Sequence, residues 1–125
     1  MHHPDVSIRR VYELPEHKKG KWILIDRLWP RGIKKEELDI DEWMKDIAPT
    51  SSLRKWFNHD PDKWTEFRQR YIQELKDKKE LIKDILEKAE KSKKITLLYA
   101  AKDPEHNHAL VLQAFLQSWP NEPDF

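Results

Sequence analysis

The residues best suited to chemistry lie in two short stretches, each at the end of an apolar run of strand length. Their side chains are carboxylates, guanidiniums, imidazoles, an amide, a phenol and an indole. They are Asp26, Arg27, Trp29 and Arg31 in the first stretch, and Tyr99, Asp103, His106, Asn107 and His108 in the second. Because a guanidinium can bind a carboxylate or phosphate with two hydrogen bonds and an imidazole titrates near neutral pH, these residue types predict a site for a small anion.

The members of this predicted site divide into catalytic and ligand-binding candidates. Asp26 would orient the substrate or act as a base. His106 or His108 would transfer a proton, which typically contributes roughly 10²–10⁴-fold to a rate. The ligand-binding candidates are Arg27, Trp29, Arg31, Tyr99, Asp103 and Asn107.

Ordinary structural roles are open to the same side chains. Asp26 and Arg27 could pair with neighbouring residues or cap a loop, and Trp29 could pack beneath the turn that follows it. Asp103 could cap a turn. The sequence does not choose between these roles and a binding site.

A metal or cofactor is not expected. His106 and His108 are two residues apart and do not share a helix face, so with Asp103 they could ligate a metal only from a loop. The chain has no Gly-rich phosphate loop, no Gly-x-Ser-x-Gly motif and no His-Glu-x-x-His motif.

A second cluster indicates a different class of function. Arg54, Trp56, Phe57 and His59 combine basic and aromatic side chains, as do surfaces that stack the bases of single-stranded nucleic acid. Aromatic residues at this short helical spacing are more often part of a core. A non-catalytic module that binds nucleic acid or protein is therefore the alternative to an enzyme-like anion site.

The composition restricts the remaining classes. A chain of 125 residues is expected to form one domain, with its core at about residues 7–117. Lys and Arg number 24 against 23 Asp and Glu, a balance that disfavours nucleic-acid binding by bulk charge. The absence of cysteine excludes disulfides, thiol nucleophiles and Cys-ligated zinc. Without an apolar leader or a run of membrane-spanning length, we expect a cytoplasmic protein, and His2 and His3 are assigned no role.

Three segments predict strands: residues 7–14, which are rich in Ile, Val and Tyr, and residues 22–28 and 94–101. The last two are apolar almost throughout, which is typical of strands buried on both faces. Residues 34–38 predict a helical turn. Residues 40–47 fit either a helix or an extended segment, which should end by Ala48 because Pro49 follows.

The predicted helices occupy the second half of the chain. A short helix capped by Ser51 or Ser52 runs through Phe57, and Asp60-Pro61 starts the next one. Apolar stripes follow over residues 64–75 and 81–89, joined by a wholly charged stretch that leaves one bent helix or two helices open. A final helix carries apolar residues from 109 to 116, and residues 118–125 are expected to form a loose tail.

These elements predict a small α/β protein, a three-layer sandwich whose mostly parallel sheet of three to four strands is flanked by helices. In such sheets the carboxyl ends of the strands share one edge, where ligands bind. The start of the last helix adds a partial positive charge at that edge. We therefore expect the two chemically equipped stretches to meet there around a small anionic ligand.

Three segments together resemble the YeaO-like branch of domain-of-unknown-function family 488. They are IDRLWPRG at residues 25–32, WMKDIAPTSSLRKWFNHDPDKWTEFRQRY at residues 43–71 and TLLYAAKDPEHNHA at residues 96–109. The resemblance covers about residues 8–115 and implies a small α/β domain of bacterial or archaeal cytoplasm, with no particular activity.

The resemblance also bears on the predicted site. Broader members of the family carry a Cys-His-Arg triplet at the start of the last helix, where this chain has Asn107-His108-Ala109. Only His108 carries over, so the resemblance implies no thiol chemistry here. Asp26-Arg27 is similar to an acidic–basic pair that follows the same strand in those relatives.

Overall fold

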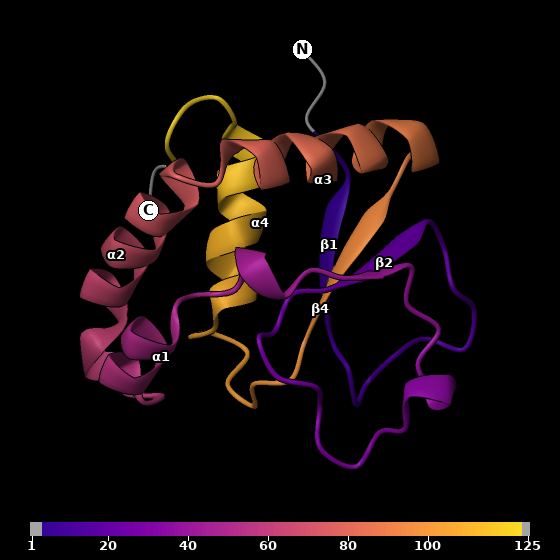
Figure 1. The fold of residues 1–125 in the computed structure, drawn as a ribbon, viewed down its shortest axis with the longest axis horizontal. Helices are drawn as coiled ribbons and strands as arrows, with labels where there is room; N and C mark the ends of the chain where they lie inside the picture. Colours follow the sequence, from indigo (N-terminus) through magenta and orange to yellow (C-terminus); the bar gives the residue numbers. More distant parts are fainter. Residues whose placement is uncertain (1–3, 124–125) are drawn as a thin grey trace.

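A computed structural model describes residues 4–123, so residues 1–3, with His2 and His3, and residues 124–125 lie outside the description. Its centre is a four-stranded sheet in which every neighbouring pair of strands is parallel. The strands are β1 Val6–Arg10, β2 Lys21–Leu24, β3 Glu42–Trp43 and β4 Ile95–Tyr99, in the order β1-β4-β2-β3 (Figure 1). The predicted α/β class with a parallel sheet is confirmed.

The helices lie between β3 and β4 and after β4. They are α1 Ser51–Phe57, α2 Trp64–Lys76, α3 Lys79–Ser92 and α4 His108–Ser118. Three single-turn 3₁₀ helices, η1 Lys35–Glu37, η2 Lys45–Ile47 and η3 Pro61–Lys63, complete the regular structure of residues 4–123. None of the helices in the described part of the chain is long and apolar enough to cross a membrane.

The two faces of the sheet are covered differently. Side chains alternate between the faces along a strand, and Ile23, Ile95 and Leu97 point into the main core with the apolar residues of all four α-helices. Leu24 and Leu98 point the other way, into a smaller core covered by the connections between the first three strands and by η1. We call this second side the loop-covered face; Figure 1 shows the long helices gathered on the opposite side.

The central strands follow the predicted pattern because burial on both faces requires apolar residues throughout. All five residues of β4 are buried, as are Trp22 to Leu24 of β2. β1, β2 and β4 are each shorter than the segment predicted for them, since pairing ends where the chain turns away from the sheet. Residues 40–47, which fit either an extended segment or a helix, contain both: the short strand β3 is followed by the 3₁₀ helix η2.

Two helix predictions were refined by the structure. Thr50, and not Ser51 or Ser52, caps α1, because its Oγ1 accepts a hydrogen bond from the Leu53 N–H at 3.3 Å. The long apolar–charged segment forms two helices, α2 and α3, that break at residues 77–78. Asp60 and Pro61 start η3, which lies between α1 and α2 and leads directly into α2, and the Asp60 carboxylate accepts from the Asp62 N–H.

The segment after α4 packs against the rest of the protein. Trp119 contacts the main core and its ring lies 5.8 Å from that of Phe115. Glu122 forms an ion pair with Lys76 at the end of α2. The part of the expected tail that is described thus contacts both α4 and α2.

Candidate functional site at the carboxyl edge of the sheet

Asp26 joins the ends of β2 and β4. It lies two residues beyond β2, and its Oδ2 accepts a hydrogen bond from the Ala100 N–H at 3.0 Å. Its other oxygen, Oδ1, lies 3.0 Å from Nε2 of His108, the first residue of α4. One carboxylate therefore connects both central strands to the last helix, at the edge where the sequence predicts a site.

The imidazole of His108 lies between two acceptors. Its Nε2 is 3.1 Å from the Ile25 carbonyl oxygen and 3.0 Å from Asp26 Oδ1. The geometry allows a hydrogen bond from the ring N–H to the Ile25 carbonyl. Within the described residues, the buried Oδ1 of Asp26 has no hydrogen-bond partner. The contact with Asp26 is therefore one of charge, attractive when the imidazole is protonated. An Asp–His pair of this kind can hold an imidazole in one orientation for proton transfer.

Tyr71 of α2 closes one side of this pair. Its ring lies 6.3 Å from that of His108, and its hydroxyl donates to the Ile47 carbonyl at 2.7 Å. Burial, reinforced by the nearby negative charges of Glu74 and Asp26, raises the pKa of Tyr71 well above its usual value. The phenol therefore stays neutral and serves as a donor. Only 14% and 15% of the His108 and Asp26 side chains are exposed, so little of either is accessible to a substrate.

Arg27 does not present its guanidinium to an open site. Its Nε and Nη2 donate to the carbonyl oxygens of Pro49 and Ala48 at 3.3 and 3.2 Å, which holds the loop between η2 and α1 against the sheet. Lys78 donates to the same Ala48 carbonyl at 3.1 Å. Burial and the charge of Arg27 lower the pKa of Lys78, although the carboxylate of Glu74 opposes them.

The other members of the first stretch lie apart from this pair. The Trp29 indole N–H donates to the Ile33 carbonyl at 2.6 Å, and its ring packs edge-on against Trp43 in the core of the loop-covered face. Arg31 is exposed, and its carbonyl accepts the Tyr12 hydroxyl at 2.7 Å. Neither side chain joins Asp26 and His108.

The second stretch forms a compact turn before α4. Asp103 accepts from the Glu105 N–H at 2.9 Å, and its other oxygen lies 2.8 Å from His106 Nδ1. The Glu105 N–H and then the His106 ring hold the pKa of Asp103 below its usual value. The His106 ring packs edge-on against Trp64 at 5.5 Å.

Asn107 and Tyr99, which were predicted to bind a ligand, have structural roles near the start of α4 and at the end of β4. Asn107 caps α4 by accepting from the Leu110 N–H at 3.1 Å, and its amide donates to the Asp103 carbonyl. Tyr99 is buried in the main core, and burial raises its pKa. Among the described residues, no three His, Asp or Glu side chains come together as a metal site requires.

The alternative cluster is divided by the packing of α1. Phe57 is buried and stacks on Phe67 with ring centroids 4.3 Å apart. Trp56 is covered by the Arg70 guanidinium at 4.3 Å and by Lys63 at 5.2 Å. Arg54 and His59 are exposed, as a module that binds nucleic acid would require, but the two rings are occupied by intramolecular contacts.

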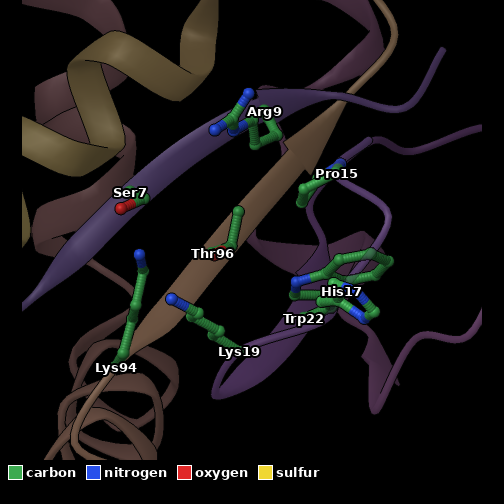
Figure 2. Close-up of a pocket in the computed structure, with 8 residues that line it drawn as sticks. All are labelled: Ser7, Arg9, Pro15, His17, Lys19, Trp22, Lys94 and Thr96. Carbon is green, nitrogen blue, oxygen red and sulfur yellow. The ribbon is translucent and has the colours of Figure 1, made fainter. Parts of the chain in front are cut away.

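A cavity that the sequence reasoning missed lies on the loop-covered face. It has a volume of about 220 Å³ and is lined by Ser7, Arg9, Pro15, His17, Lys19, Trp22, Lys94 and Thr96 (Figure 2). The sequence signal was the polar pair Ser7 and Arg9, which alternates with apolar residues in β1. Such alternation indicates one face that is not part of an apolar core.

A second hollow lies between α1 and α2. Its volume is about 350 Å³, and its walls carry both charges as well as hydroxyls. The lining residues are Thr50, Ser52, Leu53, Arg70, Gln73 and Glu74. Glu74 is engaged there, since its two oxygens accept from the main-chain N–H and the hydroxyl of Thr50.

Comparison with known proteins gives one family. A family model described as "Inactive DUF488-N3 subclade" matches residues 5–124. Uncharacterized protein YeaO of Escherichia coli (strain K12) is 44% identical over 114 residues, which cover 91% of this chain and 98% of that protein. Uncharacterized protein Rv3073c of Mycobacterium tuberculosis (strain ATCC 25618 / H37Rv) is 37% identical over 111 residues, covering 89% and 92%. No solved structure matches significantly. The predicted resemblance to the YeaO-like branch of family 488 is confirmed. The chain therefore belongs to the family described as the inactive DUF488-N3 subclade.

Proposed function

We propose that this protein is a cytoplasmic, non-catalytic domain that binds a small anion in the cavity of the loop-covered face. The ligand is still the small anion expected from the sequence, but its site is the cavity and not the carboxyl edge of the sheet. Its main support is the charge of that cavity, where Arg9, Lys19 and Lys94 are cationic and none of the described lining residues is acidic.

The bonds at the carboxyl edge support a non-catalytic role. The side chains of Asp26, Arg27 and Asn107 are engaged with main-chain groups, and His108 contacts the Ile25 carbonyl. A catalytic group needs a reacting atom within hydrogen-bond reach, and little of the Asp26–His108 pair is exposed. The description of the matching family as inactive agrees with this role.

The cations that line the cavity differ from other lysines on the same surface, which have an acidic partner. The nearby Lys18 and Lys21 have an acidic partner, since both lie within ion-pair distance of Asp41. Arg9, Lys19 and Lys94 instead share a hollow lined by neutral hydroxyls and His17. Several like charges in one concavity focus a positive potential and attract anions.

The test is a calorimetric titration of the protein with inorganic phosphate at low ionic strength. We expect binding that weakens with added salt. The Arg9→Gln/Lys94→Gln double variant should weaken it about tenfold or more, because two charge-assisted contacts are lost. Lys83→Gln, an exposed lysine of α3 away from the cavity, is the matched control and should bind as the parent does.

Two results would contradict the proposal. Absence of phosphate binding, or binding that the double variant leaves unchanged, would remove the cavity as the anion site. Arg27→Gln distinguishes the two locations, because loss of binding in that variant alone would return the anion to the carboxyl edge.

A further inference from the structure

Resting on this proposed function, we infer that the ligand is a phosphate monoester with a small organic group. The inference adds the chemical class of the ligand to its charge. It depends on the arrangement of donors on the cavity floor, on the number of cations around them and on the volume of the cavity.

Strand register builds the floor of the cavity. Thr96 of β4 lies opposite Ser7 of β1 on one side and opposite Trp22 of β2 on the other. Ser7 and Thr96 therefore place two hydroxyls side by side on neighbouring strands. Arg9 and Lys94 each lie two residues from this row on the same face, one toward each end of the strands.

The cationic side chains surround that row of hydroxyls. Figure 2 shows the ammonium group of Lys94 turned toward Ser7 and that of Lys19 turned toward the Lys94 side chain, with the guanidinium of Arg9 farther along β1. Lysine and arginine donate to oxyanions from several directions, and hydroxyls add neutral donors at the floor. The set suits a group with several acceptor oxygens rather than a flat carboxylate with two.

The number of charges favours a monoester over a diester. A phosphate monoester carries about −1.5 to −2 at pH 7 and has three terminal oxygens. A diester has one charge and two such oxygens, so it would leave more of the cavity's positive charge unpaired. Against Arg9, Lys19 and Lys94 the dianion is the better match.

The volume and the remaining wall limit the organic group. About 220 Å³ is below the roughly 300–1,000 Å³ of pockets that take drug-sized ligands. The phosphate would occupy the hydroxyl-lined part, which leaves space for a short carbon skeleton beside Pro15 and Trp22. A phosphorylated compound with about three to five carbons fits better than a dinucleotide.

The loop that forms the wall is held before any ligand arrives. Lys18 pairs with Asp41 at 2.8 Å and lies over the Trp22 ring at 5.5 Å. Gly20, with φ +69°, brings the loop against the Lys94 carbonyl, where an added Cβ would lie only 2.1 Å from the oxygen. A wall fixed in this way lowers the ordering cost of binding.

The experiment compares four probes by calorimetric titration at one ionic strength: glycerol 3-phosphate, inorganic phosphate, dimethyl phosphate and succinate. We expect glycerol 3-phosphate to bind more tightly than inorganic phosphate, and about tenfold or more tightly than the diester and the dicarboxylate. Ser7→Ala should weaken glycerol 3-phosphate and leave succinate almost unchanged. Ser51→Ala, an exposed hydroxyl on α1, is the matched control.

The outcomes separate this inference from the proposed function. If none of the probes binds, both are overturned. Suppose that phosphate binds through Arg9 and Lys94 but that dimethyl phosphate or succinate binds as tightly as glycerol 3-phosphate. The inference of a phosphate monoester is then wrong, and the proposed anion binding stands. Unfolding curves of every variant, matched to that of the parent, exclude a damaged fold as the cause of lost binding.

Discussion

The imidazole of His108 lies against the carboxylate of Asp26, with 3.0 Å between Nε2 and Oδ1. The same carboxylate accepts the Ala100 N–H, and the same imidazole lies 3.1 Å from the Ile25 carbonyl. Two side chains suited to acid–base catalysis thus fasten the ends of β2 and β4 to the start of α4. Their first effect is on stability, and that effect can be measured.

Replacement of Asp26 by alanine should lower the free energy of unfolding by about 1–3 kcal/mol, because the Ala100 N–H loses its acceptor in a poorly solvated place. Chemical denaturation measures the change. Asp39→Ala is the matched control, since that carboxylate is 85% exposed and should cost at most about 0.5 kcal/mol. Equal losses in the two variants would show that Asp26 has no clamping role.

The two glycines with positive φ offer a second test. Gly20 and Gly32 have φ of +69° and +77°, so alanine is strained at both positions, at about 1–3 kcal/mol each. Only at Gly20 would the new Cβ also meet a backbone oxygen, that of Lys94 at 2.1 Å; at Gly32 nothing lies within 4 Å. Gly20→Ala should therefore be the more destabilising variant in urea titrations, and it should also weaken phosphate binding by displacing the cavity wall. A larger loss for Gly32→Ala would contradict this placement of the loop.

The aromatic cluster of α1 gives a third test. Phe57 is buried and packs against both Trp64 and Phe67, so Phe57→Ala should cost about 3–5 kcal/mol by leaving a hole in the core. Arg54 is exposed, and Arg54→Ala should change stability by less than about 0.5 kcal/mol. Thermal or urea unfolding measures both. If Phe57→Ala lost little stability but abolished binding to single-stranded RNA, the result would instead favour the nucleic-acid module.

Apolar periodicity predicted the parts of the fold that are governed by burial. The continuous apolar runs became β2 and β4, which are covered on both faces. Asp60-Pro61 was predicted to start a helix, and in the structure it starts η3, which is followed directly by α2. The convergence of Asp26 and His108 also followed from strand direction alone, because the carboxyl ends of parallel strands meet at one edge.

Partners provided by the main chain could not be predicted in the same way. Arg27 donates to the carbonyls of Ala48 and Pro49, and Trp29 donates to that of Ile33. Because every residue has a main-chain carbonyl, the sequence does not indicate which one will accept such a bond. The cavity depends on how the loop before β2 crosses the sheet, which rests on the close approach of Gly20 to the Lys94 carbonyl. A sequence pattern specifies neither contact.

The carboxylate that holds this loop should make stability depend on pH. Burial alone would raise the pKa of Asp41, but the hydrogen bonds from Lys18 and the Trp22 N–H and the charges of Lys18 and Lys21 outweigh it, so the pKa lies below its usual 3.8. Because the folded state holds the carboxylate more strongly than the unfolded chain, the stabilisation is present above the unfolded pKa and is lost as pH falls through the folded one.

Asp41→Asn removes this contribution. The parent should exceed the variant by about 1 kcal/mol in unfolding free energy near pH 7, a figure discounted for the partial exposure of Asp41. The difference should shrink as the pH is lowered to about 3 and below. Urea denaturation of both proteins across that range measures it, and the pH dependence from Asp103, whose pKa is also lowered, cancels in the comparison. A difference that stays constant or grows toward acid pH would show that Asp41 does not hold the loop through its charge.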